Sequence, residues 1–127
     1  MKRRIIASAV LLAIVITVCT VGQLTVDGCG KDISKLLDSA KTSIKKEDYK
    51  AAAHYSQKAE DKYVDCERKL SFFINHDLIE DLGVEVAKLN ALAGEETADE
   101  FLSEISCAEV MLTHLMNDYK PSLYTVF

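Results

Sequence analysis

The sequence predicts an all-α protein: an N-terminal transmembrane helix followed by a four-helix bundle of two antiparallel hairpins. Three observations support this class. A long uncharged apolar segment follows a basic N-terminus, later apolar residues recur at three- and four-residue spacing, and the chain of 127 residues has one proline. Such spacing forms one face of a helix. No stretch alternates apolar and polar residues cleanly enough to predict a strand.

The first predicted element is residues 1–26, a basic N-terminus and membrane anchor. Residues 2–4 are Lys-Arg-Arg, and residues 5–26 carry no charge. As a helix these residues extend roughly 33 Å, enough to cross the hydrocarbon core of a bilayer. The cations favour a cytoplasmic N-terminus, so the C-terminal domain is expected outside the cytoplasm, at the cell membrane. A cleaved signal peptide is the alternative, although Val18 and Val21 are larger than the residues of a strong cleavage site.

Three further regions follow the anchor. The sequence Val-Asp-Gly-Cys-Gly at 26–30 predicts a glycine-rich hinge over residues 27–31. Residues 32–120 are predicted to form the extracytoplasmic bundle. Pro121 ends the last helix, which leaves a tail over 121–127. Its apolar side chains are expected to fold back onto a groove between helices, with a frayed tail as the alternative.

The bundle helices are predicted from their apolar stripes. The expected buried positions are Ile33, Leu36, Leu37, Ala40 and Ile44 in the first helix, Ala52, Tyr55, Ala59, Tyr63, Cys66, Leu70 and Phe73 in the second, Leu78, Leu82, Val86, Leu89 and Ala93 in the third, and Phe101, Ile105, Ala108, Leu112 and Leu115 in the fourth. Asp48 is expected to cap the second helix. Gly94 is expected to stop the third, and Thr97 to Glu100 form a capping box for the fourth. The first pair resembles a tetratricopeptide unit, but two units favour a compact bundle over a solenoid.

Charge is distributed unevenly along the predicted domain. Residues 27–76 hold ten Lys and Arg against nine Asp and Glu, whereas residues 77–127 hold two against eleven. The acidic half disfavours binding to nucleic acid or anionic lipid. It suits a basic partner, loosely held cations, or simply a solvated surface.

The cysteines predict no zinc or redox motif. Cys19 lies in the apolar segment, and Cys29, Cys66 and Cys107 lie beyond it without a C-x-x-C pair. Cys66 and Cys107 lie on or beside apolar helix faces, where a thiol packs as a small hydrophobe. A Cys66–Cys107 disulfide is the alternative in an oxidising compartment.

The segment FFINHDLIEDL, residues 72–82, gathers five ligand-capable side chains. His76 and Glu80 lie four residues apart and share a helix face, which makes them candidate metal ligands. A transition-metal site needs at least three ligands, and the other histidines lie on other helices. Helix initiation explains the segment better: Asn75 caps, Ile74 and Ile79 form a hydrophobic staple, and the acidic residues suit the first turn.

No catalytic or cofactor motif is present. The sequence lacks G-x-S-x-G, a cysteine and histidine in a suggestive local frame, and a phosphate-binding glycine loop. We therefore expect no enzyme activity and no cofactor.

The order of these features resembles a known family. A basic N-terminus, one membrane helix, a helical pair ending in LSFFINHDLIEDL, a second pair and the closing PSLYTVF together resemble the short bacterial membrane proteins grouped as domain of unknown function 4363. The likeness covers nearly the whole chain and is most specific at residues 73–77 and 123–127. It implies a retained anchor and an all-helical outer domain, without a catalytic residue to transfer.

Two functional hypotheses follow. In the first, the bundle is a non-enzymatic module that binds another membrane or extracytoplasmic protein; the candidate contacts are His76, Glu95, Glu96, Asp99 and Glu100. In the second, the acidic second hairpin and His76 bind a cation or small ligand, as a sensor would.

Overall fold

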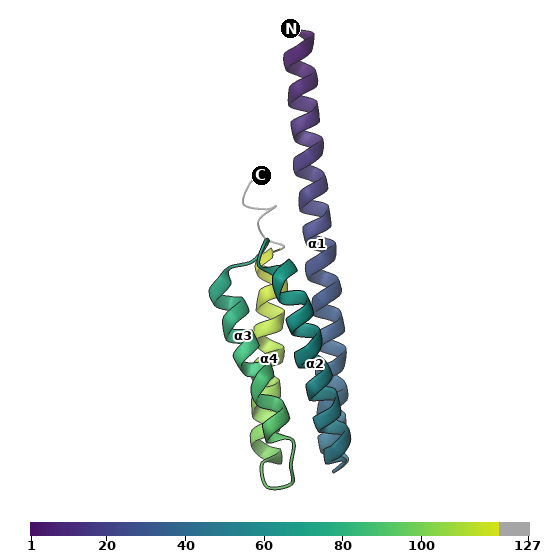
Figure 1. Cartoon of the computed structure of the whole chain (residues 1–127), viewed down its shortest axis with the longest axis vertical. Coiled ribbons are helices and arrows are strands. Elements are labelled where there is room, and N and C mark those ends of the chain that lie inside the picture. The colour runs from purple at the N-terminus through teal and green to yellow at the C-terminus, as the bar shows by residue number, and fades with distance from the viewer. Residues whose placement is uncertain (120–127) are drawn as a thin grey trace.

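Four helices make up the part of the chain that the structure, a computed structural model, describes, which is residues 1–119 (Figure 1). They are α1 (Lys2–Lys45), α2 (Tyr49–Leu70), α3 (His76–Leu92) and α4 (Ala98–Tyr119). Consecutive helices run antiparallel, and α1 also packs against α4, so that the helices close into a ring. The predicted all-α bundle is confirmed. The tail predicted over 121–127 lies outside the described residues.

Helix α1 is continuous from the N-terminus into the bundle. Its exposed N-terminal part projects beyond the other helices, and its C-terminal part is one of the four bundle helices (Figure 1). The prediction of a hinge over 27–31 is wrong, because this segment is helical throughout. Cys29 and Gly30 are buried there, and burial continues at Ile33 and Leu37 in helical spacing. Tertiary packing of this face outweighs the low helix propensity of two glycines.

The core runs along the bundle axis. Its completely buried large side chains come from all four helices: Val26, Ile33 and Leu37; Leu70; Ile79, Leu82, Val86 and Leu89; Phe101, Ile105 and Leu115. Every position predicted for the fourth stripe is buried. Leu36, Tyr55, Phe73 and Ala93 were also predicted as core, and they are partly buried at its margin. The prediction of Leu78 as a core position is wrong, because α3 turns the neighbouring Ile79 into the core and leaves Leu78 partly exposed.

The loops keep their predicted caps in two cases. The Asp48 carboxylate accepts a hydrogen bond from the amide of Ala51 at 3.1 Å, and the Asn75 side chain accepts one from the amide of Asp77 at 3.0 Å. Glu47, just before the first cap, has a positive φ of 61° and turns the chain between α1 and α2. The helix after Asn75 therefore starts where the local sequence predicted.

One helix end differs from the prediction. Helix α2 ends at Leu70 instead of Phe73, because the chain enters a turn in which Ile74 donates its amide to the Leu70 carbonyl. Helix α3 ends at Leu92 with Ala93 as its C-cap, so Gly94 directly follows the cap, as a glycine that stops a helix does. At the start of α4, the Thr97 hydroxyl donates to the Leu92 carbonyl at 2.7 Å, so it joins α3 to α4.

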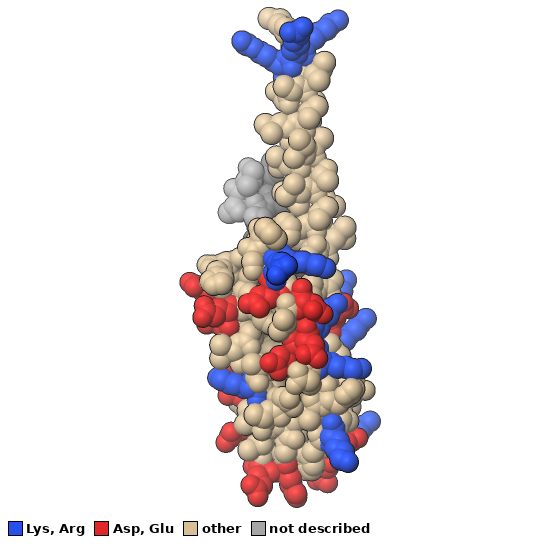
Figure 2. All heavy atoms as spheres, in the orientation of Figure 1, with Lys and Arg blue, Asp and Glu red and all other residues tan. Residues whose placement is uncertain are grey.

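The surface has two distinct parts. Residues 5–21 are exposed and uncharged, and Figure 2 shows them as a bare column between the cations at the N-terminus and the charged bundle. By length and composition α1 is suited to crossing a membrane. The candidate sites are on the bundle.

Candidate binding surfaces and the α1–α2 disulfide

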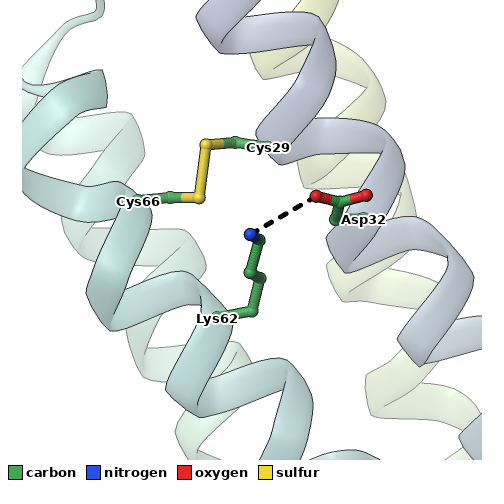
Figure 3. Close-up of a disulfide and its surroundings, with 4 residues drawn as sticks. All are labelled: Cys29, Asp32, Lys62 and Cys66. Atoms are coloured by element: carbon green, nitrogen blue, oxygen red, sulfur yellow. Dashed lines mark ion pairs between the residues drawn. A yellow bond between two sulfur atoms is a disulfide. The ribbon is translucent and has the colours of Figure 1, made fainter.

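A disulfide joins α1 to α2. Cys29 and Cys66 form the bond, with their Cα atoms 6.1 Å apart, well within the usual range for a disulfide (Figure 3). The alternative Cys66–Cys107 pairing is therefore wrong: Cys107 lies exposed on α4 with a free thiol. Pairing with Cys29 was missed because residues 27–31 were assigned to a hinge. The signal was present in the sequence, since Val26, Cys29 and Ile33 continue one helical face.

An ion pair lies beside the disulfide. Lys62 Nζ is 3.4 Å from Asp32 Oδ2, and both side chains point into the space between α1 and α2 (Figure 3). Each is two-fifths or more exposed, so the pair contributes little to stability. The ion pair and the disulfide together fix which turn of α1 lies opposite which turn of α2.

Tyr63 connects α2 to α3. The side chain is 3% exposed, and its hydroxyl donates to the carbonyl of Ile79. Burial raises the pKa of the Tyr63 hydroxyl well above its ordinary value, and the nearby Glu67 raises it further. Gly83 makes room for the ring, since a Cβ there would lie 2.9 Å from a ring carbon. This is a structural contact, with the hydroxyl occupied and away from solvent.

The predicted metal pair, His76 and Glu80, lies on the surface at the start of α3. His76 Nε2 is 4.0 Å from Glu80 Oε2, and the two side chains are 79% and 68% exposed. Among residues 1–119, no group of three or more His, Cys, Asp or Glu side chains is placed to hold a metal ion. The cation-sensor hypothesis therefore has only this exposed pair as a geometric basis in that part of the chain.

The candidate partner contacts fall at opposite ends of α3. His76 begins α3 at the end of the bundle from which α1 projects. Glu95, Glu96, Asp99 and Glu100 follow the other end of α3, in the loop to α4 and the first turn of α4. A helix of 17 residues separates them by roughly 25 Å. All four acidic residues are exposed. We call these four residues the acidic tip; His76 is not part of it.

A second acidic contact lies between α3 and α4. Glu85 carries a salt bridge to Lys88 at 3.3 Å, and its side chain is 13% exposed. Its hydrogen bond and its negative charge raise the pKa of Glu104 above the ordinary value.

Surface hollows on the bundle are open and mixed in character. One of about 320 Å³ lies between α1 and α4, lined by Ser34, Lys35, Asp38, Glu109, Leu112, Thr113 and Met116. Beside it, Lys41 Nζ and Glu109 Oε2 lie 3.6 Å apart and join the two helices.

These features define a class: an all-α protein in which a long helix, apolar enough to cross a membrane, continues into a closed and disulfide-linked bundle. The chain belongs to the family described as "Domain of unknown function (DUF4363)", which it matches over residues 23–126. The resemblance inferred from the sequence is thereby confirmed. Comparison with curated proteins and with solved structures gave no match. The family match begins where α1 enters the bundle and includes all four bundle helices.

Proposed function

We propose that this protein is a single-pass membrane protein whose bundle lies outside the cytoplasm and binds another protein without catalysing a reaction. The observation that carries the proposal is the continuity of α1. An exposed apolar helix that passes without a break into a folded bundle suits an anchor that presents the bundle at a membrane surface.

The Cys29–Cys66 disulfide supports the orientation. Structural disulfides persist in oxidising compartments and are rare in the cytosol. Cations at residues 2–4 favour a cytoplasmic N-terminus, which puts the bundle on the opposite side. Both features point to the same topology from different parts of the chain.

The acidic tip is the surface that we assign to the partner. It lies at the end of the bundle farthest from the apolar segment, where the end of Figure 2 opposite the N-terminus shows clustered acidic side chains. Four carboxylates within six residues favour a partner with a basic surface, and such charges act mainly on association rate and specificity. The partner is expected to be a membrane or extracytoplasmic protein.

Cross-linking in intact membranes tests this assignment. In the tip variant, Glu95, Glu96 and Glu100 are changed to Gln and Asp99 to Asn. Neutral replacements are used because a cation near the N-terminus of α4 would be repelled by the helix dipole. A matched control neutralises Glu60, Asp61, Asp65 and Glu67, which are four carboxylates within eight residues of α2. We expect a specific cross-linked protein that is lost in the tip variant and kept in the control.

Two results would count against the proposal. A cross-linked partner that both variants retain would place the contact elsewhere on the bundle. An absence of any partner, together with calcium- or zinc-dependent melting of the purified protein, would favour the sensor hypothesis.

A further inference from the structure

The corner between α2 and α3 carries an unusually exposed aromatic ring. Phe72 is 80% exposed, more than any other apolar side chain of the bundle, while Phe73 and Ile74 beside it are packed against the core. The corner lies at the end of the bundle nearest to the projecting part of α1 (Figure 1). Two exposed cations, Arg68 and Lys69, precede it on α2.

The disulfide shows which residue of α1 lies level with this corner along the bundle axis. Cys29 and Cys66 lie opposite each other, and their helices run antiparallel. Phe72 is six residues beyond Cys66, in the turn that directly follows α2, and Gln23 is six residues before Cys29. A helical rise puts each roughly 9 Å from the disulfide along the bundle axis. The Asp32–Lys62 ion pair has the same register, because Asp32 is three residues after Cys29 and Lys62 is four before Cys66. Phe72 is therefore level with Gln23, within the uncharged run of α1.

The length of the exposed, uncharged segment of α1 determines where the outer boundary of a bilayer would lie along this helix. Residues 5–21, the wholly exposed part of the run, extend roughly 26 Å, whereas the hydrocarbon core is about 30 Å thick. About three more residues are needed, which brings the outer boundary to Leu24. Leu24 is itself 68% exposed, as a lipid-facing residue would be. Any tilt of α1 lengthens the required path and draws the bundle nearer to the membrane.

We propose that the α2–α3 corner is a second membrane contact, in which Phe72 inserts at the outer interface of the bilayer that α1 crosses. Arg68 and Lys69 are four and three residues nearer to the disulfide, roughly 5–6 Å further out, among the lipid headgroups. An aromatic ring at the boundary and long cations that reach into the headgroups are the typical interfacial anchors. This inference rests on the proposed membrane anchoring.

Charge contributes little to this contact. Asp77 and Glu80 are exposed on the first turns of α3, and Glu67 is exposed beside Arg68. These carboxylates offset the two cations, so the contact is not a basic patch that needs anionic lipid. Insertion should therefore occur in a neutral phosphatidylcholine bilayer, driven by burial of the ring.

The absence of tryptophan from the chain permits a direct test. Phe72→Trp, Leu12→Trp and Val110→Trp each place one fluorophore in the full-length protein, reconstituted in phosphatidylcholine vesicles. The lipids are brominated either near the glycerol end or near the methyl end of the acyl chain, which quenches tryptophan according to depth. Val110 is 55% exposed on α4, next to Glu109, whose salt bridge to Lys41 places it at least ~20 Å below the corner.

The expected result is a depth order. Leu12→Trp should be quenched most by deep bromine, Phe72→Trp several-fold more by shallow bromine than Val110→Trp, and Val110→Trp hardly at all. If Leu12→Trp is quenched and Phe72→Trp behaves like Val110→Trp, the corner contact is overturned while the anchor stands. A blue-shifted but unquenched Phe72→Trp would mean a protein contact, such as a second copy, and would also overturn it. If Leu12→Trp escapes quenching, the anchor itself fails, and the corner contact with it.

Discussion

Glycines 28, 30 and 83 all lie within helices, yet each meets different surroundings. A Cβ on Gly28 would meet open space, whereas one on Gly30 would lie 2.5 Å from the Met116 sulfur and one on Gly83 would press on the Tyr63 ring. Met116 ends in a flexible chain that can move aside. The Tyr63 ring cannot, because it is buried and its hydroxyl is held by the Ile79 carbonyl. Gly30 and Gly83 therefore serve helix packing whereas Gly28 does not, and none of the three has a positive φ.

Two alanine substitutions should have opposite effects. Gly83→Ala forces a methyl group against a fixed ring, and overpacking of this kind costs about 1–3 kcal/mol, more than the gain in helix propensity. Gly28→Ala meets no neighbour and should stabilise the helix by about 0.5–1 kcal/mol. Thermal unfolding of the full chain in detergent, followed by circular dichroism, should show a lower Tm for the first and a higher Tm for the second. Equal shifts for the two would show that Tyr63 does not restrict Gly83.

The pairing of α1 with α2 depends on the covalent bond more than on charge. The Asp32–Lys62 pair is exposed and weak, while the Cys29–Cys66 disulfide closes a loop of 37 residues and is itself buried in the core. A cross-link of this length restricts the unfolded chain substantially. The disulfide therefore also secures the height of the α2–α3 corner relative to the apolar segment.

Removal of the disulfide should lower stability without changing the fold. Cys29→Ser with Cys66→Ser is expected to cost about 2–4 kcal/mol in the free energy of unfolding, because the unfolded chain gains freedom. Cys107→Ser is the matched control, since that thiol is exposed and free, and it should leave the Tm unchanged. Peptide mapping that recovers a Cys66–Cys107 bond, or an unchanged Tm in the double variant, would contradict this pairing.

Local sequence patterns predicted the individual helices better than the contacts and connections between them. Asp48 and Asn75 act on amides two or three residues away, so their capping roles could be inferred from adjacent residues. The stripe from Phe101 to Leu115 likewise needs only helical spacing. Gly30 is different, because a glycine that breaks a helix and one that admits a neighbouring side chain look alike in sequence. The neighbour here, Met116, is 86 residues away in the chain. The disulfide partner was lost with that same misassignment.

The candidate site was predictable only in its parts. The acidic residues at 95–100 were identified from the sequence, and the structure places all four at one end of the bundle. His76 was grouped with them, but α3 holds it at the opposite end. Which exposed residues share a surface depends on the direction of each helix, and that direction is set by packing of the whole bundle.

At the scale of the whole molecule, chemical labelling of one thiol can report on which side of the membrane the bundle lies. Cys29 and Cys66 are oxidised, Cys19 lies in the apolar segment, and Cys107 is exposed on α4. In intact cells, a membrane-impermeant maleimide should label the full-length protein at Cys107 if the bundle is outside the cytoplasm. Cys107→Ser should abolish the label. Labelling that requires lysis of the cells would place the bundle in the cytoplasm.

Continuity of α1 has a mechanical consequence. A flexible linker would let a folded head reorient while its anchor stayed still, whereas one uninterrupted helix of 44 residues transmits bending and rotation along its length. In a membrane, a force applied at the acidic tip would act on a lever with two arms of similar length, the part of α1 in the bundle and the part in the bilayer. A partner that tilts the bundle would thereby turn the Lys-Arg-Arg end in the opposite direction, with the lipid interface as the fulcrum.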